Sequence, residues 1–181
     1  GAGGNIQIWN GTVWSQQNSG VAADLFAISG SNANDVYIVG SGGTILRGSG
    51  GIWSQETSTV AQKLYGVSAL GSGAAWAVGE QGTILSRPGT TWQAHSSGWR
   101  STLRAIWISA SGRGWAAGDG GLLRWDGQSW GNPVPLAGVT LTGVWGSAEN
   151  DVWAVGQGGS MYHYTGSSWQ AMPQAGHEFS A

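Results

Sequence analysis

The chain has 181 residues, which suits one compact domain, and its 40% hydrophobic content with 13 tryptophans argues against disorder despite 34 glycines. Only 9% of the residues are charged, the formal net charge is −2, and the seven basic residues are scattered, so no electrostatic footprint for nucleic acid or an anionic membrane is present. No apolar run reaches the about 18 residues of a membrane span, and the lack of cysteine excludes a disulfide framework and a thiolate metal site.

A tryptophan recurs at an almost constant interval along the chain. The successive intervals are 39, 39, 38 and 39 residues, counted between Trp14, Trp53, Trp92, Trp130 and Trp169. A glycine stands three residues before each of these tryptophans, beginning with Gly11 and Gly50. A fixed period of this length indicates stacked copies of one supersecondary unit.

Each copy is predicted to consist of four short antiparallel strands. In the copy that ends at Trp53, extended pieces are expected at 25–29, 36–39 and 44–47 and around the tryptophan itself, because β-branched and aromatic residues alternate with glycine-rich, Asn- and Asp-containing connections. No window has helical periodicity. Repeated four-stranded units of this kind predict the blades of a β-propeller, whereas a β-sandwich gives no reason for a period of 39 residues.

The predicted fold is therefore an all-β, single-domain β-propeller of about five blades over residues 1–181. Four complete repeats of 38–39 residues follow an N-terminal half-blade, and the expected segments are 1–14, 15–53, 54–92, 93–130, 131–169 and a tail, 170–181. The count leaves closure open. A five-bladed ring would need residues 174–181 to dock beside Ile6 with Phe179 buried. The other two possibilities are that the chain, which begins without Met, is a piece of a longer propeller, and that chains exchange half-blades in a homo-oligomer.

The recurring aromatic residues are predicted to form the core between neighbouring sheets. This applies to the five periodic tryptophans and to the aromatic residue of the second strand in each copy, namely Tyr37, Trp76, Trp115 and Trp153. Asp126, before a glycine, is interpreted as a hairpin-turn former and not as a catalytic acid.

Two phrases resemble a known group of repeats. The runs Trp125-Asp126-Gly127-Gln128-Ser129-Trp130 and Asn150-Asp151-Val152-Trp153-Ala154-Val155-Gly156 are similar to Gly/Trp-rich bacterial β-propeller repeats, which are related to Asp-box (neuraminidase-type) and photosystem assembly-factor propellers. The resemblance covers nearly the whole chain. It implies a propeller and a secreted or cell-surface bacterial setting, but no activity. Sialidases with Asp-boxes use an arginine triad, and the six arginines show no such arrangement.

The search for catalytic groupings favours a protein that is not an enzyme and that needs no cofactor. His95, expected in a loop, His163 and His177 share no repeat position and have no metal-ligand spacing. The glycine-rich turns lack the lysine and the following helix of a phosphate loop. One enzyme-type possibility is that Glu80 and Asp119 meet at the mouth of the ring.

Six residues are candidates for ligand binding. The turn between the second and third strands of each copy places Ser41, Glu80, Asp119 and Gln157 at one rim near the axis, either as solvated turn residues or as a ring of hydrogen-bonding groups. Trp99 has no aromatic counterpart, its equivalents being Val21, Val60, Ala137 and Gly176, and Arg100 follows it. An aromatic residue beside an arginine can stack on a sugar or anchor a protein; alternatively, it fixes the loop to the next blade.

The first hypothesis for function is a non-catalytic, lectin-like propeller that binds a glycan through repeated shallow sites, which add up to avidity. The alternative is a protein-interaction scaffold, or part of a larger bacterial surface or secreted propeller protein. The two differ in their expected surface. A lectin predicts equivalent sites in each blade, and a scaffold predicts one contiguous patch.

Overall fold

The structure of the protein is a computed structural model that describes residues 1–173. Over these residues there is no α-helix, and the only helical pieces are four 3₁₀ turns of three residues each. The all-β prediction is therefore confirmed for the described part of the chain. The predicted docking of residues 174–181, with Phe179, lies outside the described residues.

The first half of the chain forms a half-blade and two four-stranded sheets of sequential antiparallel strands. The half-blade contains β1 (Ile6–Trp9) and β2 (Trp14–Gln17). Blade 1 contains β3 (Leu25–Asn32), β4 (Asp35–Gly40), β5 (Ile45–Ser49) and β6 (Ile52–Glu56), and blade 2 contains β7 (Leu64–Gly71), β8 (Ala74–Gly79), β9 (Ile84–Arg87) and β10 (Gln93–His95). His95 therefore belongs to a strand and not to the loop in which it was predicted.

The second half of the chain differs from the predicted repeat, because its last six strands form one continuous sheet. These strands are β11 (Leu103–Ile108), β12 (Gly114–Trp125), β13 (Trp130–Ala148), β14 (Asp151–Gly156), β15 (Met161–Tyr164) and β16 (Trp169–Ala171). The predicted turn at Asp119 lies inside β12, and the predicted loop after Trp130 lies inside β13. The reason is pairing: Asp119 lies opposite Thr140 and Leu122 opposite Val134, with a register shift between Asp119 and Gly121, where the backbone has positive φ. We call β11, β12 and the start of β13 blade 3, and the part from Leu141 onward blade 4.

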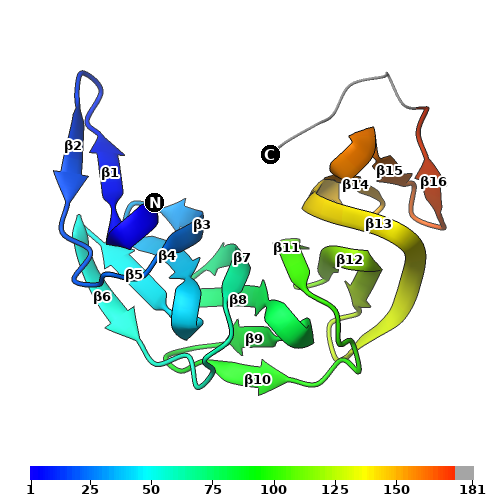
Figure 1. Ribbon diagram of the computed structural model, residues 1–181, viewed down its shortest axis with the longest axis horizontal. Coiled ribbons are helices and arrows are strands. Elements are labelled where there is room, and N and C mark those ends of the chain that lie inside the picture. Colours follow the sequence, from blue (N-terminus) through cyan, green and yellow to red (C-terminus); the bar gives the residue numbers. More distant parts are fainter. Residues whose placement is uncertain (174–181) are drawn as a thin grey trace.

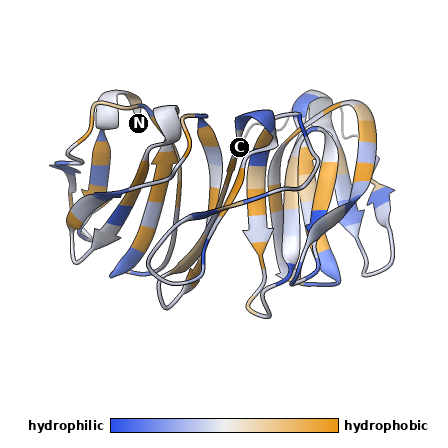
Figure 2. Ribbon diagram, turned by 90° about the horizontal axis from the view of Figure 1, so that it is seen from below, coloured by the Kyte–Doolittle hydropathy of each residue, from blue (hydrophilic) through white to orange (hydrophobic). Residues whose placement is uncertain are grey.

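The sheets are arranged as an open arc (Figure 1). Strands β3, β7 and β11 lie on its concave side, whereas β2, β6, β10 and β16 lie on its convex side. The half-blade and blade 4 stand at opposite ends of the arc, so residues 1–173 do not form the self-closed five-bladed ring that was one prediction. The four 3₁₀ turns η1 (Ala2–Gly4), η2 (Ser41–Gly43), η3 (Glu80–Gly82) and η4 (Gln157–Gly159) share one rim (Figure 2).

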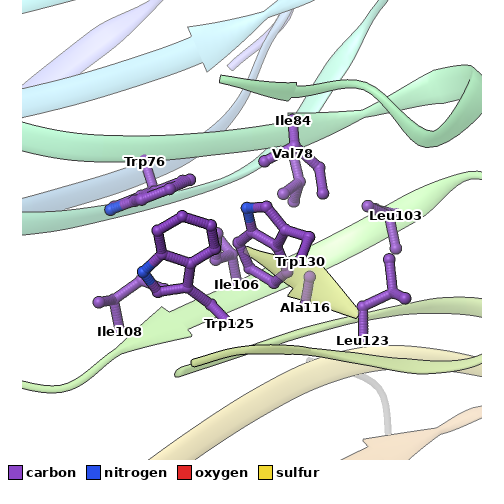
Figure 3. Close-up of a cluster of buried hydrophobic side chains, with 10 residues drawn as sticks. All are labelled: Trp76, Val78, Ile84, Leu103, Ile106, Ile108, Ala116, Leu123, Trp125 and Trp130. Atoms are coloured by element: carbon purple, nitrogen blue, oxygen red, sulfur yellow. The ribbon is translucent and has the colours of Figure 1, made fainter. Parts of the chain in front are cut away.

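The hydrophobic core consists of clusters between successive sheets. The cluster between blades 2 and 3 is built around Trp76, Trp125 and Trp130 (Figure 3). Similar clusters lie between blades 1 and 2, between blades 3 and 4, and between the half-blade and blade 1. Blades 1–3 therefore use both faces of their sheets, and stability depends on contacts between neighbouring blades, as in other repeat folds.

The prediction that the periodic tryptophans form the core is correct only where a preceding sheet covers them. Trp92 and Trp130 are buried, and Trp53 and Trp169 are half-buried. Trp14 is 65% exposed, so the prediction is wrong for this residue. These side chains pack on the preceding sheet, and no described sheet lies before β1 and β2. The aromatic residues of the second strands are buried in blades 1–3, but Trp153 is half-buried and stacks on His163.

Candidate functional site

A β-bulge in the first strand of every blade turns one side chain away from the regular alternation. In blade 1, Leu25 lies opposite Gly40 but Ala27 lies opposite Val39, so Phe26 has no partner across the pair. The same register shift occurs at the equivalent position of the other three blades, where the unopposed residues are Tyr65, Arg104 and Thr142. Bulges of this kind re-aim a side chain and are frequent beside functional sites.

Three of the four bulged side chains contact one another from blade to blade, on the first strands that line the concave side of the arc (Figure 1). The rings of Phe26 and Tyr65 have centroids 5.3 Å apart, and the Arg104 guanidinium lies over the Tyr65 ring at 5.8 Å. We call Phe26, Tyr65, Arg104 and Thr142 the axial row. Phe26 is 43% exposed, which makes it one of the large hydrophobic residues open to solvent.

Glu80, a predicted site residue at the start of η3, is hydrogen-bonded to the beginning of strand β7. Its carboxylate accepts from the backbone N–H of Lys63 (3.2 Å) and from the hydroxyl of Tyr65 (3.2 Å), and it lies 3.8 Å from the Lys63 ammonium. Burial, together with this hydrogen bond to a carboxylate, raises the pKa of Tyr65 above its usual value. Tyr65 therefore remains a protonated donor at neutral pH.

Asp119, the equivalent acid of blade 3, is paired with the axial row in the same way. The Arg104 guanidinium donates from Nε to Asp119 Oδ1 (2.7 Å) and from Nη2 to Oδ2 (3.1 Å), a two-point pairing that fixes both groups. This hydrogen bonding raises the pKa of Arg104 further. Both side chains remain 34% exposed, so the pair is reachable from solvent.

The predicted ring of hydrogen-bonding groups is thus only partly formed. Glu80 and Asp119 are linked through Tyr65 and Arg104. Ser41 contacts its own blade instead, since its hydroxyl accepts from the backbone N–H of Asp24 at 3.0 Å. Gln157 is exposed, and its backbone carbonyl accepts from Ser160.

Both acids of the expected enzyme-type pair are engaged by neighbouring side chains. Glu80 and Asp119 each have a cationic partner, so neither of the two carboxylates is poised as a free acid or base. Among residues 1–173, no group of three or more His, Asp or Glu side chains is arranged to hold a metal ion. The same residues contain no helix that is long and apolar enough to cross a membrane.

A second feature is a shallow hollow that recurs at the rim beside the 3₁₀ turns. Three equivalent hollows, of about 530, 620 and 460 Å³, are lined by residues near Gly4, Gly43 and Gly82 and by the loop that leaves the last strand of the same blade. Each of these glycines has a positive φ, and a Cβ there would collide with the carbonyl oxygen of Val21, Val60 or Trp99. The turn and the loop are therefore packed together in the same way in each copy.

Trp99 and Arg100, both predicted site residues, line the third hollow. Trp99 is half-buried and packs against the cluster between blades 2 and 3, and Arg100 is exposed. The spatial equivalent of Trp99 in the next copy is Val134 and not Ala137, because Gly121 approaches the Val134 carbonyl there. The interpretation of Trp99 as a loop anchor is thus correct in part, since its counterparts Val21 and Val60 are apolar and occupy the same place.

Phe26, Tyr65 and Arg104 were not among the residues that the sequence singled out. A signal for them exists: in each copy one variable residue stands between a constant leucine and a small residue, as in Leu64-Tyr65-Gly66 and Leu103-Arg104-Ala105. A position that varies between two constant ones indicates a side chain that folding does not use.

Comparison with known proteins identifies the fold. No protein-family model matches the chain, and no curated protein matches it in sequence. Among solved structures, a YCF48 bound to a D1 peptide has a TM-score of 0.65 at 21% identity, covering 89% of this chain and 57% of that one. YCF48 from Cyanidioschyzon merolae has a TM-score of 0.63 at 20% identity, covering 93% and 65%. A protein of unknown function from Bacteroides caccae has a TM-score of 0.59 at 12% identity, covering 89% and 63%.

The two YCF48 structures are β-propellers, so the expected relation to photosystem assembly-factor propellers is confirmed at the level of the fold. The relation to Asp-box repeats stays a prediction. The chain spans about three fifths of the length of the YCF48 chains.

Proposed function

We propose that this chain is a non-catalytic β-propeller module that binds another protein, and that it holds an extended polypeptide segment across the axial row. The observation that carries the proposal is the row itself. At one repeat position the four blades carry four chemically different side chains, Phe26, Tyr65, Arg104 and Thr142, and the first three form a continuous strip of contacts. A strip of this kind favours a contiguous protein-binding patch over identical sites in each blade.

The composition of the strip suits a protein partner. Aromatic and arginine side chains are enriched at the centre of protein interfaces, where they supply apolar area with a polar group at its edge. Phe26 offers an exposed ring, Tyr65 offers a ring beside a fixed hydroxyl, and Arg104 offers a guanidinium held in place by Asp119. Side chains that are already oriented lose little conformational entropy on binding.

The likeness to a YCF48 structure that holds a D1 peptide supports the same class of ligand. It supports a peptide as the probe and not a particular partner. Of the two functions expected from the sequence, the scaffold therefore has more support than the lectin.

The experiment is a selection from a phage-displayed library of random extended peptides on the immobilised chain. Selected peptides are then tested against Tyr65→Ala and Arg104→Gln. The proposal predicts that each substitution weakens binding by about tenfold, roughly 1.4 kcal/mol, because each removes one contact of the strip. Arg113→Gln is the matched control, since Arg113 is also paired with a carboxylate (3.4 Å from Glu149) but lies in the connection between β11 and β12, outside the strip.

Peptides that bind the wild type and the control equally but lose affinity for the two axial variants support the proposal. Failure to enrich any peptide contradicts it, and so does enrichment of peptides that bind all four proteins alike. Circular dichroism and thermal unfolding of each variant show whether a loss of binding reflects a loss of folding.

Glycan binding is the second candidate, and the repetition of the rim hollows favours it. Three equivalent, shallow and mostly uncharged hollows would let a polymeric glycan engage several weak sites at once. A glycan array with the wild-type chain tests this function, and binding that survives Tyr65→Ala and Arg104→Gln would separate it from the peptide site.

The setting in which the protein works is also a proposal. We expect secretion or display at a bacterial surface, which immunodetection in the medium and surface fractions of the source cell would test. We also propose that two chains associate through the half-blade, which sedimentation at several concentrations would detect.

A further inference from the structure

The three rim hollows share the same packing of turn against loop but differ in the side chains of one wall. At the position that follows the Val21, Val60 or Trp99 carbonyl, the first two copies have an exposed alanine, Ala22 and Ala61, and the third has the exposed side chain of Arg100. The same third hollow has the indole of Trp99 where the others have valine. Because the alanine and valine copies pack the same turn, folding requires neither the arginine nor the indole.

The charge of Arg100 is also unusual within this molecule. All seven basic residues lie within residues 1–173. Five of them form ion pairs with Asp or Glu: Arg47, Lys63, Arg87, Arg104 and Arg113. A sixth, Arg124, lies over the rings of Trp115 and Tyr164. In the described part of the chain, Arg100 is the basic side chain left with neither kind of partner.

We propose that the hollow beside Trp99 and Arg100 binds an acidic side chain of a partner polypeptide; this inference rests on the proposed function. The guanidinium of Arg100 presents two parallel N–H donors, which match the two oxygens of a carboxylate. The indole of Trp99 forms one wall of the hollow, which has a volume of about 460 Å³. Its Nε1–H is buried without a partner, so the indole contributes an apolar face to the hollow and not a donor.

The rest of the lining fits a segment of polypeptide around that carboxylate. The amides of Gln62 and Gln81, which contact each other at 3.4 Å, and the hydroxyls of Ser96 and Ser97 offer neutral donors and acceptors for a peptide backbone. Glu80, the acid at the start of the η3 turn, has its carboxylate oxygens engaged by Lys63 and Tyr65. Glu80 is therefore not free to pair with Arg100.

The experiment is an NMR titration of the 181-residue chain with a doubly blocked pentapeptide, Gly-Gly-Glu-Gly-Gly, and with its Glu→Gln twin. The expected result is a shift of the Arg100 backbone amide and of the Trp99 indole resonance with the Glu peptide only. The affinity should fall as salt is added, because the attraction between exposed charges is screened. Arg100→Gln should lower it about tenfold, whereas Arg113→Gln, the matched control, should leave it unchanged.

A gain-of-function variant tests the same idea in a second place. Val60→Trp with Ala61→Arg copies the wall into the second hollow and should add a second set of shifts near Gly43. The inference is overturned if the two peptides give equal shifts, if Arg100→Gln binds like the wild type, or if glucuronate shifts these resonances and the Glu peptide does not. Failure of the axial row to bind peptides, with the Glu peptide still bound here, would contradict the proposed function alone.

Discussion

Two interfaces of this molecule use the same four repeat positions with different chemistry. Between blades 1 and 2, Glu56 accepts hydrogen bonds from Arg87 and from the Trp92 indole N–H, each at 2.8 Å, and Tyr37 lies beside them. Between blades 2 and 3, these positions hold His95, Trp125, Trp130 and Trp76. Their rings form one aromatic cluster, with Trp76 4.8 Å from both His95 and Trp125.

This difference shows that the repeat specifies the backbone structure but not which side chains fill each interface. A buried ion pair requires good geometry and further hydrogen bonds to offset its desolvation. Arg87 has them, because its guanidinium also donates to the carbonyls of Gly73 and Gly89. The aromatic cluster needs no such matching and gains from apolar area and ring contacts.

The largest effect on stability is expected for Trp92, which is a periodic tryptophan of the repeat and also donates a hydrogen bond to Glu56 in the first interface. Trp92→Ala should lower the free energy of unfolding by about 3–5 kcal/mol, the usual range for a buried large aromatic residue. Trp92 is 4% exposed, and its loss also removes a donor to Glu56. Urea unfolding followed by circular dichroism measures the change.

Trp14→Ala is the control for this prediction, since Trp14 occupies the same repeat position but is 65% exposed. It should change the free energy of unfolding by no more than about 0.5 kcal/mol. Equal losses for Trp92 and Trp14 would contradict the packing described between the sheets.

The next effect concerns the ion pair of the first interface. Glu56→Ala should lower the free energy of unfolding by about 3 kcal/mol, because it leaves the Arg87 guanidinium, which is 4% exposed, without a counter-charge. Removing the exposed pair of Arg113 and Glu149 by Glu149→Ala should cost less than about 1 kcal/mol. Similar losses for the two variants would mean that the Arg87–Glu56 pair is open to water.

The two interfaces should also respond to opposite ends of the pH range. Burial lowers the pKa of His95, so the unfolded chain binds a proton more readily, and stability should fall as the pH is lowered through 6.5 and below. Burial raises the pKa of Tyr37 to about 12, so the unfolded chain loses its proton first, and stability should fall as the pH rises from 10 toward 12.

Urea midpoints measured across both pH ranges test this contrast. His95→Gln should reduce only the fall in stability at acid pH, and Tyr37→Phe should reduce only the fall in stability at alkaline pH. A variant that changes the pH dependence of stability in the opposite range, or in neither range, would show that other groups dominate it.

Among the variants of the two interfaces, the smallest net effect is expected when one interface is converted into the other. The triple variant Tyr37→Trp, Glu56→His and Arg87→Trp gives blades 1 and 2 the side chains found between blades 2 and 3. Replacing a buried ion pair by apolar groups of similar volume is often neutral or stabilising, so the free energy of unfolding should stay within about 2 kcal/mol of the wild type. A loss larger than that of Glu56→Ala would show that the two frames are not interchangeable.

The sequence by itself determined the features that depend on local interactions. The tryptophan period and the glycine-rich turns predicted the two four-stranded antiparallel sheets of the first half of the chain. Asp126 was correctly interpreted as a turn former, since its carboxylate accepts from the backbone N–H groups of Gln128 and Ser129 at 2.8 Å. Turn chemistry and strand alternation act between residues close in the chain, which is why pattern alone can predict them.

The tertiary structure decided what depends on neighbours in space. The bulge that turns Tyr65 and Arg104 toward the concave side is set by the pairing of two strands, and the conversion of the expected loop after Trp130 into strand is set by its pairing with β12. Burial was likewise decided by the adjacent sheet, because Trp14 and Trp92 occupy the same repeat position but only Trp92 has a sheet packed against it. A periodic sequence encodes equivalent positions, but packing between residues about 39 apart makes those positions differ.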